Sequence, residues 1–128
     1  PSDKVRLYGV PGQRRFSFMW GVLAKRAMGL VALVNASAPS PIDDLTFQIE
    51  TFGELIRRGG LVVGVSHTDL APANVVEQLG AVAASLLPER PTPVLAVDAR
   101  NTHHMRIALM TLLADIEMRA TAQHSLPR

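Results

Sequence analysis

Four short polar stretches directly follow apolar runs along the chain, and they hold the residues best suited to ligand chemistry. They are residues 9–15 (GVPGQRR), 35–40 (NASAPS), 66–70 (SHTDL) and 98–101 (DARN). A carboxylate such as Asp69 can accept two hydrogen bonds side by side, and a Pro-Gly-Gln turn followed by two arginines could contact a phosphate. Each also has a plainer interpretation, because Asp69 suits a helix N-cap or an Asx-turn and Pro-Gly suits a type II turn.

The elements that must position these stretches alternate along the chain. Short apolar runs rich in β-branched residues favour strands, and helical spacing of apolar residues favours helices. The predicted strands are residues 4–10, 29–36, 61–65 and 93–97. The predicted helices are residues 16–27 and 42–58, a third that begins at Pro72 and a last one that begins at about residue 103. Residues 121–128 show no period, and we expect them to form a flexible tail.

This alternation predicts an α/β fold with an open, mostly parallel sheet and helices on both faces. Ligands of such sheets bind outside the carboxyl ends of the strands. The four polar stretches are therefore expected along one edge of the sheet, where their side chains can act together.

The composition limits the kinds of partner. With 128 residues the chain is expected to form one domain, and its apolar residues, 48% of the total, fall in blocks too short to cross a bilayer. A net charge of +2 gives no reason to expect a nucleic-acid partner. The absence of cysteine excludes disulfides and thiolate metal sites. No charged-then-apolar leader precedes the first predicted strand, so a cytoplasmic protein without membrane insertion is expected.

The order of three of the polar stretches resembles that of the Ras-like small GTPases. The residues of the first stretch are most similar to those of the bacterial gliding-polarity and Roadblock-associated branch. The resemblance covers the chain from the third strand of that fold onward. It implies a P-loop NTPase fold, a Ras-like G domain lacking its N-terminal phosphate-loop strand, with residues 1–120 as the carboxyl-terminal portion of a single G domain. It also implies a GTP-binding molecular switch that hydrolyses GTP slowly when full length, with GTP or GDP and Mg²⁺ as ligands.

The first polar stretch matches the switch II loop of that family, which is normally Asp-x-x-Gly-Gln. By resemblance the Gly12 amide meets the γ-phosphate and Gln13 orients the attacking water. The family's aspartate is replaced by Gly9. Arg14 and Arg15 follow in the segment that changes partners with the nucleotide, so they are candidates for binding regulatory proteins, including Roadblock-type ones; the alternative is a solvated helix start.

The third stretch matches the family's base-reading Asn-Lys-x-Asp loop. By resemblance the Asp69 carboxylate accepts hydrogen bonds from the two adjacent N–H donors of guanine, which adenine lacks. Ser66 stands where the family has asparagine, and His67 stands where it has lysine and could lie over the base. In the fourth stretch, Asp98, Ala99 and Arg100 match Ser-Ala-Lys, whose alanine N–H reads the guanine O6. Asp98 and Arg100 thus stand where the family has serine and lysine.

The phosphate-binding motif G-x-x-x-x-G-K-(S/T) does not occur in the sequence. Mg²⁺ binding would thus depend on residues outside these 128, and we expect this chain alone to be inactive. A second hypothesis, from a different class, is a catalytically inactive pseudo-GTPase that serves as a protein-interaction scaffold; Gly9, Ser66 and the missing motif favour it. A third, a receiver-like α/β domain, lacks the acidic cluster after the first strand that such domains carry.

Two adjacent histidines, His103 and His104, lie near the start of the last predicted helix. Neighbouring residues on a helix point about 100° apart, so the two rings are badly placed to share a metal ion. We expect both to be solvated helix-start residues.

Overall fold

The computed structural model describes residues 28–98 and 100–125, which contain three strands and five helical segments. In chain order these are β1 (Leu30–Asn35), α2 (Pro41–Thr51), α3 (Gly53–Arg58), β2 (Leu61–Ser66), the short 3₁₀ helix η2 (Thr68–Leu70), α4 (Val75–Leu86), β3 (Val94–Ala96) and α5 (Thr102–Ser125). The strand predicted at 4–10 and the helix predicted at 16–27 lie outside the described residues.

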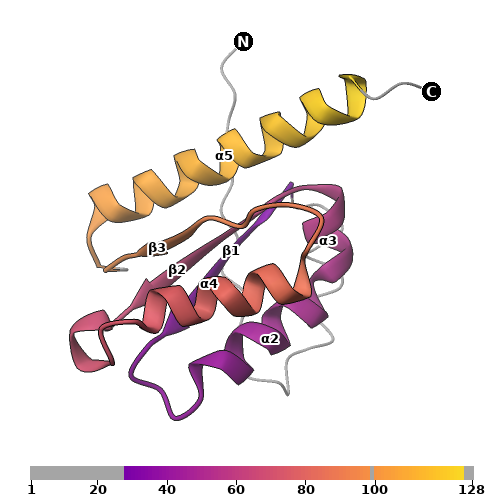
Figure 1. The fold of residues 1–128 in the computed structure, drawn as a ribbon. Helices are drawn as coiled ribbons and strands as arrows, with labels where there is room; N and C mark the ends of the chain where they lie inside the picture. Colours follow the sequence, from indigo (N-terminus) through magenta and orange to yellow (C-terminus); the bar gives the residue numbers. More distant parts are fainter. Residues whose placement is uncertain (1–27, 99, 126–128) are drawn as a thin grey trace.

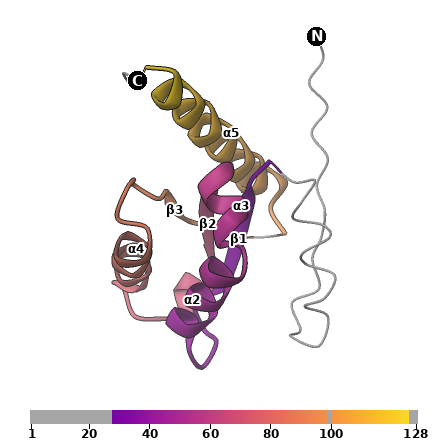
Figure 2. The same cartoon turned by 90° about the vertical axis from the view of Figure 1, so that its right-hand side faces the viewer.

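The three strands form one open sheet in the order β1-β2-β3, and both pairings are parallel. Helices α2 and α4 cover one face, and α5 crosses the other (Figure 1, Figure 2). This confirms the predicted α/β class, the three strands that fall in the described region and the placement of helices on both faces. The central strand β2 is buried from Leu61 to Val65, which explains why its sequence is apolar without alternation.

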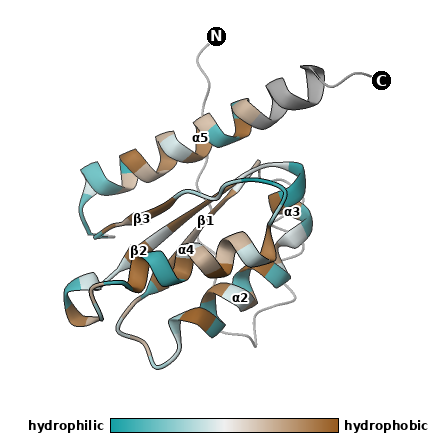
Figure 3. Ribbon diagram, in the orientation of Figure 1, coloured by the Kyte–Doolittle hydropathy of each residue, from teal (hydrophilic) through white to brown (hydrophobic). Residues whose placement is uncertain are grey.

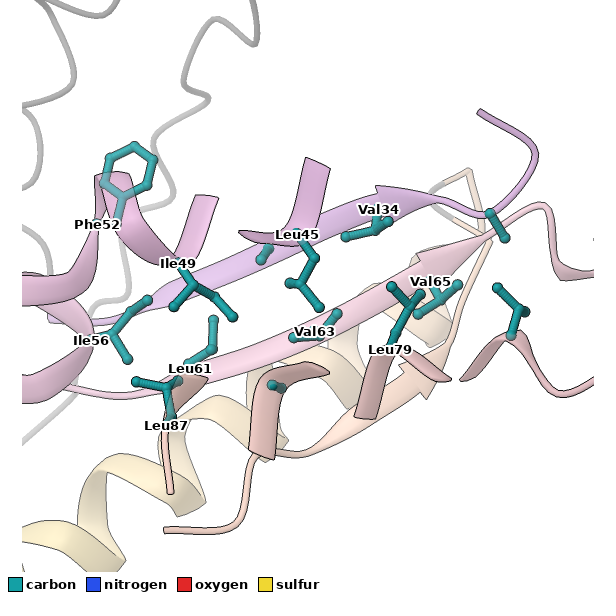
Figure 4. Packing of buried hydrophobic residues seen from close by; sticks show 14 residues of the cluster. Val34, Leu45, Ile49, Phe52, Ile56, Leu61, Val63, Val65, Leu79 and Leu87 are labelled. Carbon is teal, nitrogen blue, oxygen red and sulfur yellow. The ribbon is translucent and has the colours of Figure 1, made fainter. Parts of the chain in front are cut away.

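The main core lies between the sheet and the α2–α4 layer. Side chains on alternate residues of the strands point into it and meet leucine and isoleucine side chains of the helices (Figure 4). The largest fully buried side chains are Leu45, Ile56, Leu61, Leu79, Leu87, Val34, Val62, Val63 and Val65. The apolar colouring is concentrated on the strands and the inward helix faces (Figure 3). On the opposite face, Ala108 and Leu112 of α5 are buried.

Two predicted helices have different boundaries in the structure. The single helix predicted for 42–58 is divided at Phe52 into α2 and α3, where Gly53, a poor helix former, follows directly. Helix α4 begins at Val75, because Pro72 forces the preceding Ala71 into an extended conformation and the first helical turn forms only after it.

Helix α5 extends to Ser125, into the stretch that was expected to be a tail. Residues 119–124 (RATAQH) contain no glycine or proline, and the first helix breaker is Pro127. No helix in residues 28–98 and 100–125 is long and apolar enough to cross a membrane.

The outer edge of β1 has no strand partner among the described residues. The N–H groups of Leu30 and Ala36 donate to the carbonyls of Gly60 and Ser66, on the side of β2. Because the backbone groups of successive residues in a strand point to opposite sides, those of Leu33 point away from β2, towards the outer edge. The Leu33 carbonyl instead accepts a hydrogen bond of 3.1 Å from the Gln48 side-chain amide of α2. A helix side chain thus occupies part of the edge that a neighbouring strand would otherwise fill.

Candidate functional site

The candidate site is the edge of the sheet at which all three strands end. Asn35 is in register with Ser66, and the chain immediately beyond remains paired, since the Ala36 N–H donates to the Ser66 carbonyl at 2.9 Å. On the other side of β2, the Val97 N–H donates to the Val65 carbonyl at 2.9 Å. The parallel topology therefore brings the second, third and fourth polar stretches to one edge, as the sequence predicts.

The chain leaves β2 through a tight reversal at His67. His67 has a φ of 57° and a ψ of 34°, the left-handed conformation, and is the only non-glycine residue of the described chain with a positive φ. Its ring is exposed, and Nδ1 lies 2.9 Å from the Ser66 hydroxyl oxygen. This reversal turns the next residues out beyond the strand end, where the short helix η2 places Asp69.

Asp69 is exposed and lies in the middle of η2. The N-cap position of η2 is His67 and that of α4 is Asn74, so the interpretation of Asp69 as a helix N-cap is wrong. Within the described residues the Asp69 carboxylate makes no hydrogen bond or ion pair. Neither of its oxygens is therefore occupied by a residue of the described part of the chain.

Asp98 and Arg100 bind each other directly after β3. One oxygen of Asp98, Oδ1, accepts hydrogen bonds from the Arg100 backbone N–H at 2.9 Å and from Nε at 3.2 Å, and Oδ2 accepts one from Nη2 at 3.3 Å. These two side chains were predicted to bind a nucleotide, and in the structure they are paired with each other at an exposed position. The Arg100 side-chain hydrogen bonds, followed by its backbone hydrogen bond, hold the pKa of Asp98 below its ordinary value of 3.8.

A pH titration tests the role of Arg100. Replacing Arg100 with alanine should raise the pKa of Asp98 towards its ordinary value, because the hydrogen bonds to the charged carboxylate are lost. In the parent chain the folded pKa lies below the unfolded one, so the pair's contribution to stability is present above about pH 4 and is lost as the pH falls through the folded pKa. Carboxyl carbon shifts of Asp98, followed by NMR against pH, measure this. An unchanged titration in the variant would contradict it.

His104 contacts the same loop from α5. Its ring Nδ1 accepts a hydrogen bond of 3.0 Å from the Asp98 backbone N–H, and its backbone N–H donates to the Asn101 side-chain oxygen at 3.2 Å. His104 thus lies at the start of α5 as expected, but it is half-buried and its ring is hydrogen-bonded to the protein, whereas His103 is exposed as expected. Asn101 was the available signal for the hydrogen bond to the His104 backbone N–H, since asparagine is a favoured N-cap residue.

Asn35 was also not singled out by the sequence. Its side-chain oxygen accepts hydrogen bonds from the Ser37 backbone N–H at 2.9 Å and from the Ser37 hydroxyl at 2.7 Å. This is a local turn at the end of β1. It orders the loop that leads from the strand into α2.

The remaining predicted site residues are not placed. Gly12, Gln13, Arg14, Arg15 and Ala99 lie outside the described residues. Within residues 28–98 and 100–125, no group of three or more acidic, histidine or cysteine side chains is arranged to hold a metal ion. Among these residues the edge therefore offers the unpaired carboxylate of Asp69, the paired carboxylate of Asp98 and several backbone and hydroxyl groups, and no group of metal ligands.

Comparison with protein-family models, with curated proteins and with solved structures gives no match to this chain. The fold and the edge define an open, parallel α/β domain with helices on both faces of the sheet.

The left-handed conformation of His67 gives a prediction about stability. Replacing His67 with glycine should change the free energy of unfolding by less than about 1 kcal/mol, because glycine adopts a positive φ without steric cost. Valine should lower it by about 1–2 kcal/mol, because a β-branched side chain opposes this conformation. Urea unfolding measures both. Replacement of the exposed His103 with valine is the control, and an equal loss in both valine variants would contradict the prediction.

Proposed function

We propose that this chain carries the base-recognition part of a Ras-like G domain and binds GTP or GDP as a molecular switch. The observation that carries the proposal is the Asp69 carboxylate, which is exposed and has no partner among the described residues. It follows β2 at the edge where the strands end, which is where open α/β sheets bind their ligands.

The chemistry of Asp69 suits guanine. An ionised carboxylate offers two adjacent acceptor oxygens, and the guanine edge offers two adjacent N–H donors. The adenine edge lacks these donors, so adenine would leave a carboxylate oxygen unpaired. Because the exposed carboxylate has no partner among residues 28–98 and 100–125, it gives up no hydrogen bond to these residues when the base binds.

The neighbouring groups have narrower roles in this proposal. His67, turned outward by its left-handed backbone, is available to lie over the base. Asp98 and Arg100, which the resemblance places at the nucleotide, are engaged with each other, so in this proposal they act as a pair. Binding of the β- and γ-phosphates and Mg²⁺ needs the motif that these 128 residues lack, together with Gly12 and Gln13 in the family's switch roles.

Base recognition can be tested with guanosine and adenosine monophosphates. We expect guanosine monophosphate to shift the backbone NMR signals of residues 66–70 and 98–101, with adenosine monophosphate binding at least tenfold more weakly. Replacing Asp69 with asparagine should transfer the preference to xanthosine monophosphate, because the asparagine amide donates where the carboxylate accepts. Glu54→Gln, which removes an exposed charge on α3, is the matched control. An unchanged guanine preference in Asp69→Asn would contradict the assignment.

The second candidate function is a pseudo-GTPase scaffold. The observation in its favour is that Ser66, Asp98 and Arg100 already have internal partners, so only a few groups at the edge remain open to a nucleotide. The coding sequence upstream of the codon for Pro1 separates the two hypotheses. A G-x-x-x-x-G-K-(S/T) motif about 50 to 60 residues earlier favours the switch, and its absence favours the scaffold.

A further inference from the structure

His104 joins the first turn of α5 to the loop that follows β3. Its backbone N–H is held by the Asn101 side chain at 3.2 Å, and its ring accepts the Asp98 N–H at 3.0 Å. His104 therefore contacts this connection at two points, through its ring at Asp98 and through its backbone N–H at Asn101. Asp98 in turn binds Arg100 through both carboxylate oxygens, so the His104 imidazole is linked through Asp98 to Arg100.

The contact with Asp98 defines the protonation state of the ring. A backbone N–H can only donate, so Nδ1 must be the acceptor and must carry no proton, and the single proton of the neutral ring is then on Nε2. A doubly protonated imidazole has no acceptor at all. Protonation of His104 would place two N–H donors against each other at the Asp98 amide.

We propose that His104 is a positioning residue for the base-reading loop: its neutral imidazole holds Asp98 and Arg100 in place for a guanine nucleotide, and protonation of the ring releases the loop. The inference rests on the proposed function for its ligand. It adds a residue from outside the four polar stretches and makes nucleotide binding at this loop dependent on pH.

The charged groups around the ring come from the loop after β3 and from α5. The Asp98 carboxylate and the Arg100 guanidinium are the charged groups on the loop, and on α5 the nearest ionisable side chains, His103 and Arg106, are exposed. The hollow that His104 lines is otherwise apolar and is formed by Leu95, Ala96, Val97 and Ile107. A charged ring would thus be attracted by the Asp98 carboxylate and repelled by Arg100, and the Asp98 amide would lose its acceptor.

The first test needs no ligand. Protection of the Asp98 amide against hydrogen exchange is measured by NMR on the 128-residue chain between pH 5 and pH 8, in the parent and in two variants. His104→Asn keeps an acceptor near the Nδ1 position but does not titrate in this range, and His104→Leu has no acceptor. We expect protection to fall at least tenfold at low pH in the parent, to remain in His104→Asn and to be lost at all pH values in His104→Leu.

Thermal unfolding of each variant separates a local loss of protection from general destabilisation. Equal loss of protection in the two variants, or a parent chain whose Asp98 protection does not change with pH, would overturn the positioning role. A pH-dependent loss in His104→Asn equal to that of the parent would assign the titration to another group and overturn it as well.

The second test uses guanosine monophosphate as the probe. Binding should be several-fold weaker at pH 5.5 than at pH 7.5 in the parent, independent of pH in His104→Asn, and weak throughout in His104→Leu. Unchanged affinity in His104→Leu would overturn the link between His104 and the ligand. If no chain binds the nucleotide while the exchange pattern is as expected, the proposed function fails and the ordering of the loop by His104 stands.

Discussion

Replacing Gly59 with alanine should lower the free energy of unfolding by about 3 kcal/mol, since an added methyl group would have no space. A Cβ built on Gly59 collides with the backbone carbonyl of Met28 and lies 3.2 Å from the carbonyl oxygen of Leu55. Backbone atoms cannot move aside as the end of a flexible side chain can. Gly59 also closes α3, where its N–H donates to the Leu55 carbonyl at 2.8 Å, so a shift of the chain would disturb the entry to β2. Urea unfolding followed by circular dichroism measures the loss.

Gly80→Ala is the matched control for this experiment. Gly80 lies inside α4, and the nearest atom to an added Cβ is a methyl of Val94 at 4.0 Å. Because alanine is the better helix former, this variant should be more stable by up to about 1 kcal/mol. A loss at Gly59 no larger than about 0.5 kcal/mol would show that the α3–β2 connection can adjust, and would contradict the prediction.

Truncation of Leu79 to alanine should lower the free energy of unfolding by about 3 kcal/mol, because it leaves a cavity in the core. Leu79 has no exposed surface and projects from α4 into the core beside Val63 and Val65 of β2 (Figure 4). Its removal leaves a space that neighbours on the rigid central strand cannot fill. The midpoint of urea unfolding should fall, while the m-value, the slope of the unfolding free energy against urea concentration, should stay the same.

Leu70→Ala provides the comparison, because Leu70 is 66% exposed in η2. Its truncation should change stability by less than about 0.5 kcal/mol. Equal losses for the two leucines would mean that α4 does not pack on the sheet as described. Because Leu70 is next to Asp69 in the chain, comparing the two variants also distinguishes a loss of core packing from a change near the candidate site.

The described part of the fold could be predicted largely from apolar patterns. β2 was identified because a strand covered on both faces has no polar residues, and its burial from Leu61 to Val65 agrees with this. The division between α2 and α3 could not be predicted in the same way. Phe52 and Ile56 continue the helical period across the break, so periodicity alone gives one helix where the backbone forms two.

For the site, the sequence predicted which stretches meet but not how their side chains pair. Strand ends of a parallel sheet must share an edge, which is why the positions of residues 66–69 and 98–100 followed from the order of elements. The ion pair between Asp98 and Arg100 and the contact of His104 with the Asp98 amide depend on the loop conformation and on side-chain rotamers. Neither is encoded in residue spacing.

The hydrogen bond from Gln48 to the Leu33 carbonyl has a consequence for association between molecules. Another chain can extend a sheet only by pairing with the backbone groups of an open edge, which is how many proteins aggregate. By occupying one acceptor in the middle of β1, the Gln48 amide interrupts the row that an incoming strand would need. Among the described residues, Gln48 thus occupies with one side chain part of a sheet edge of the kind that many proteins protect with a charge, a bulge or a proline.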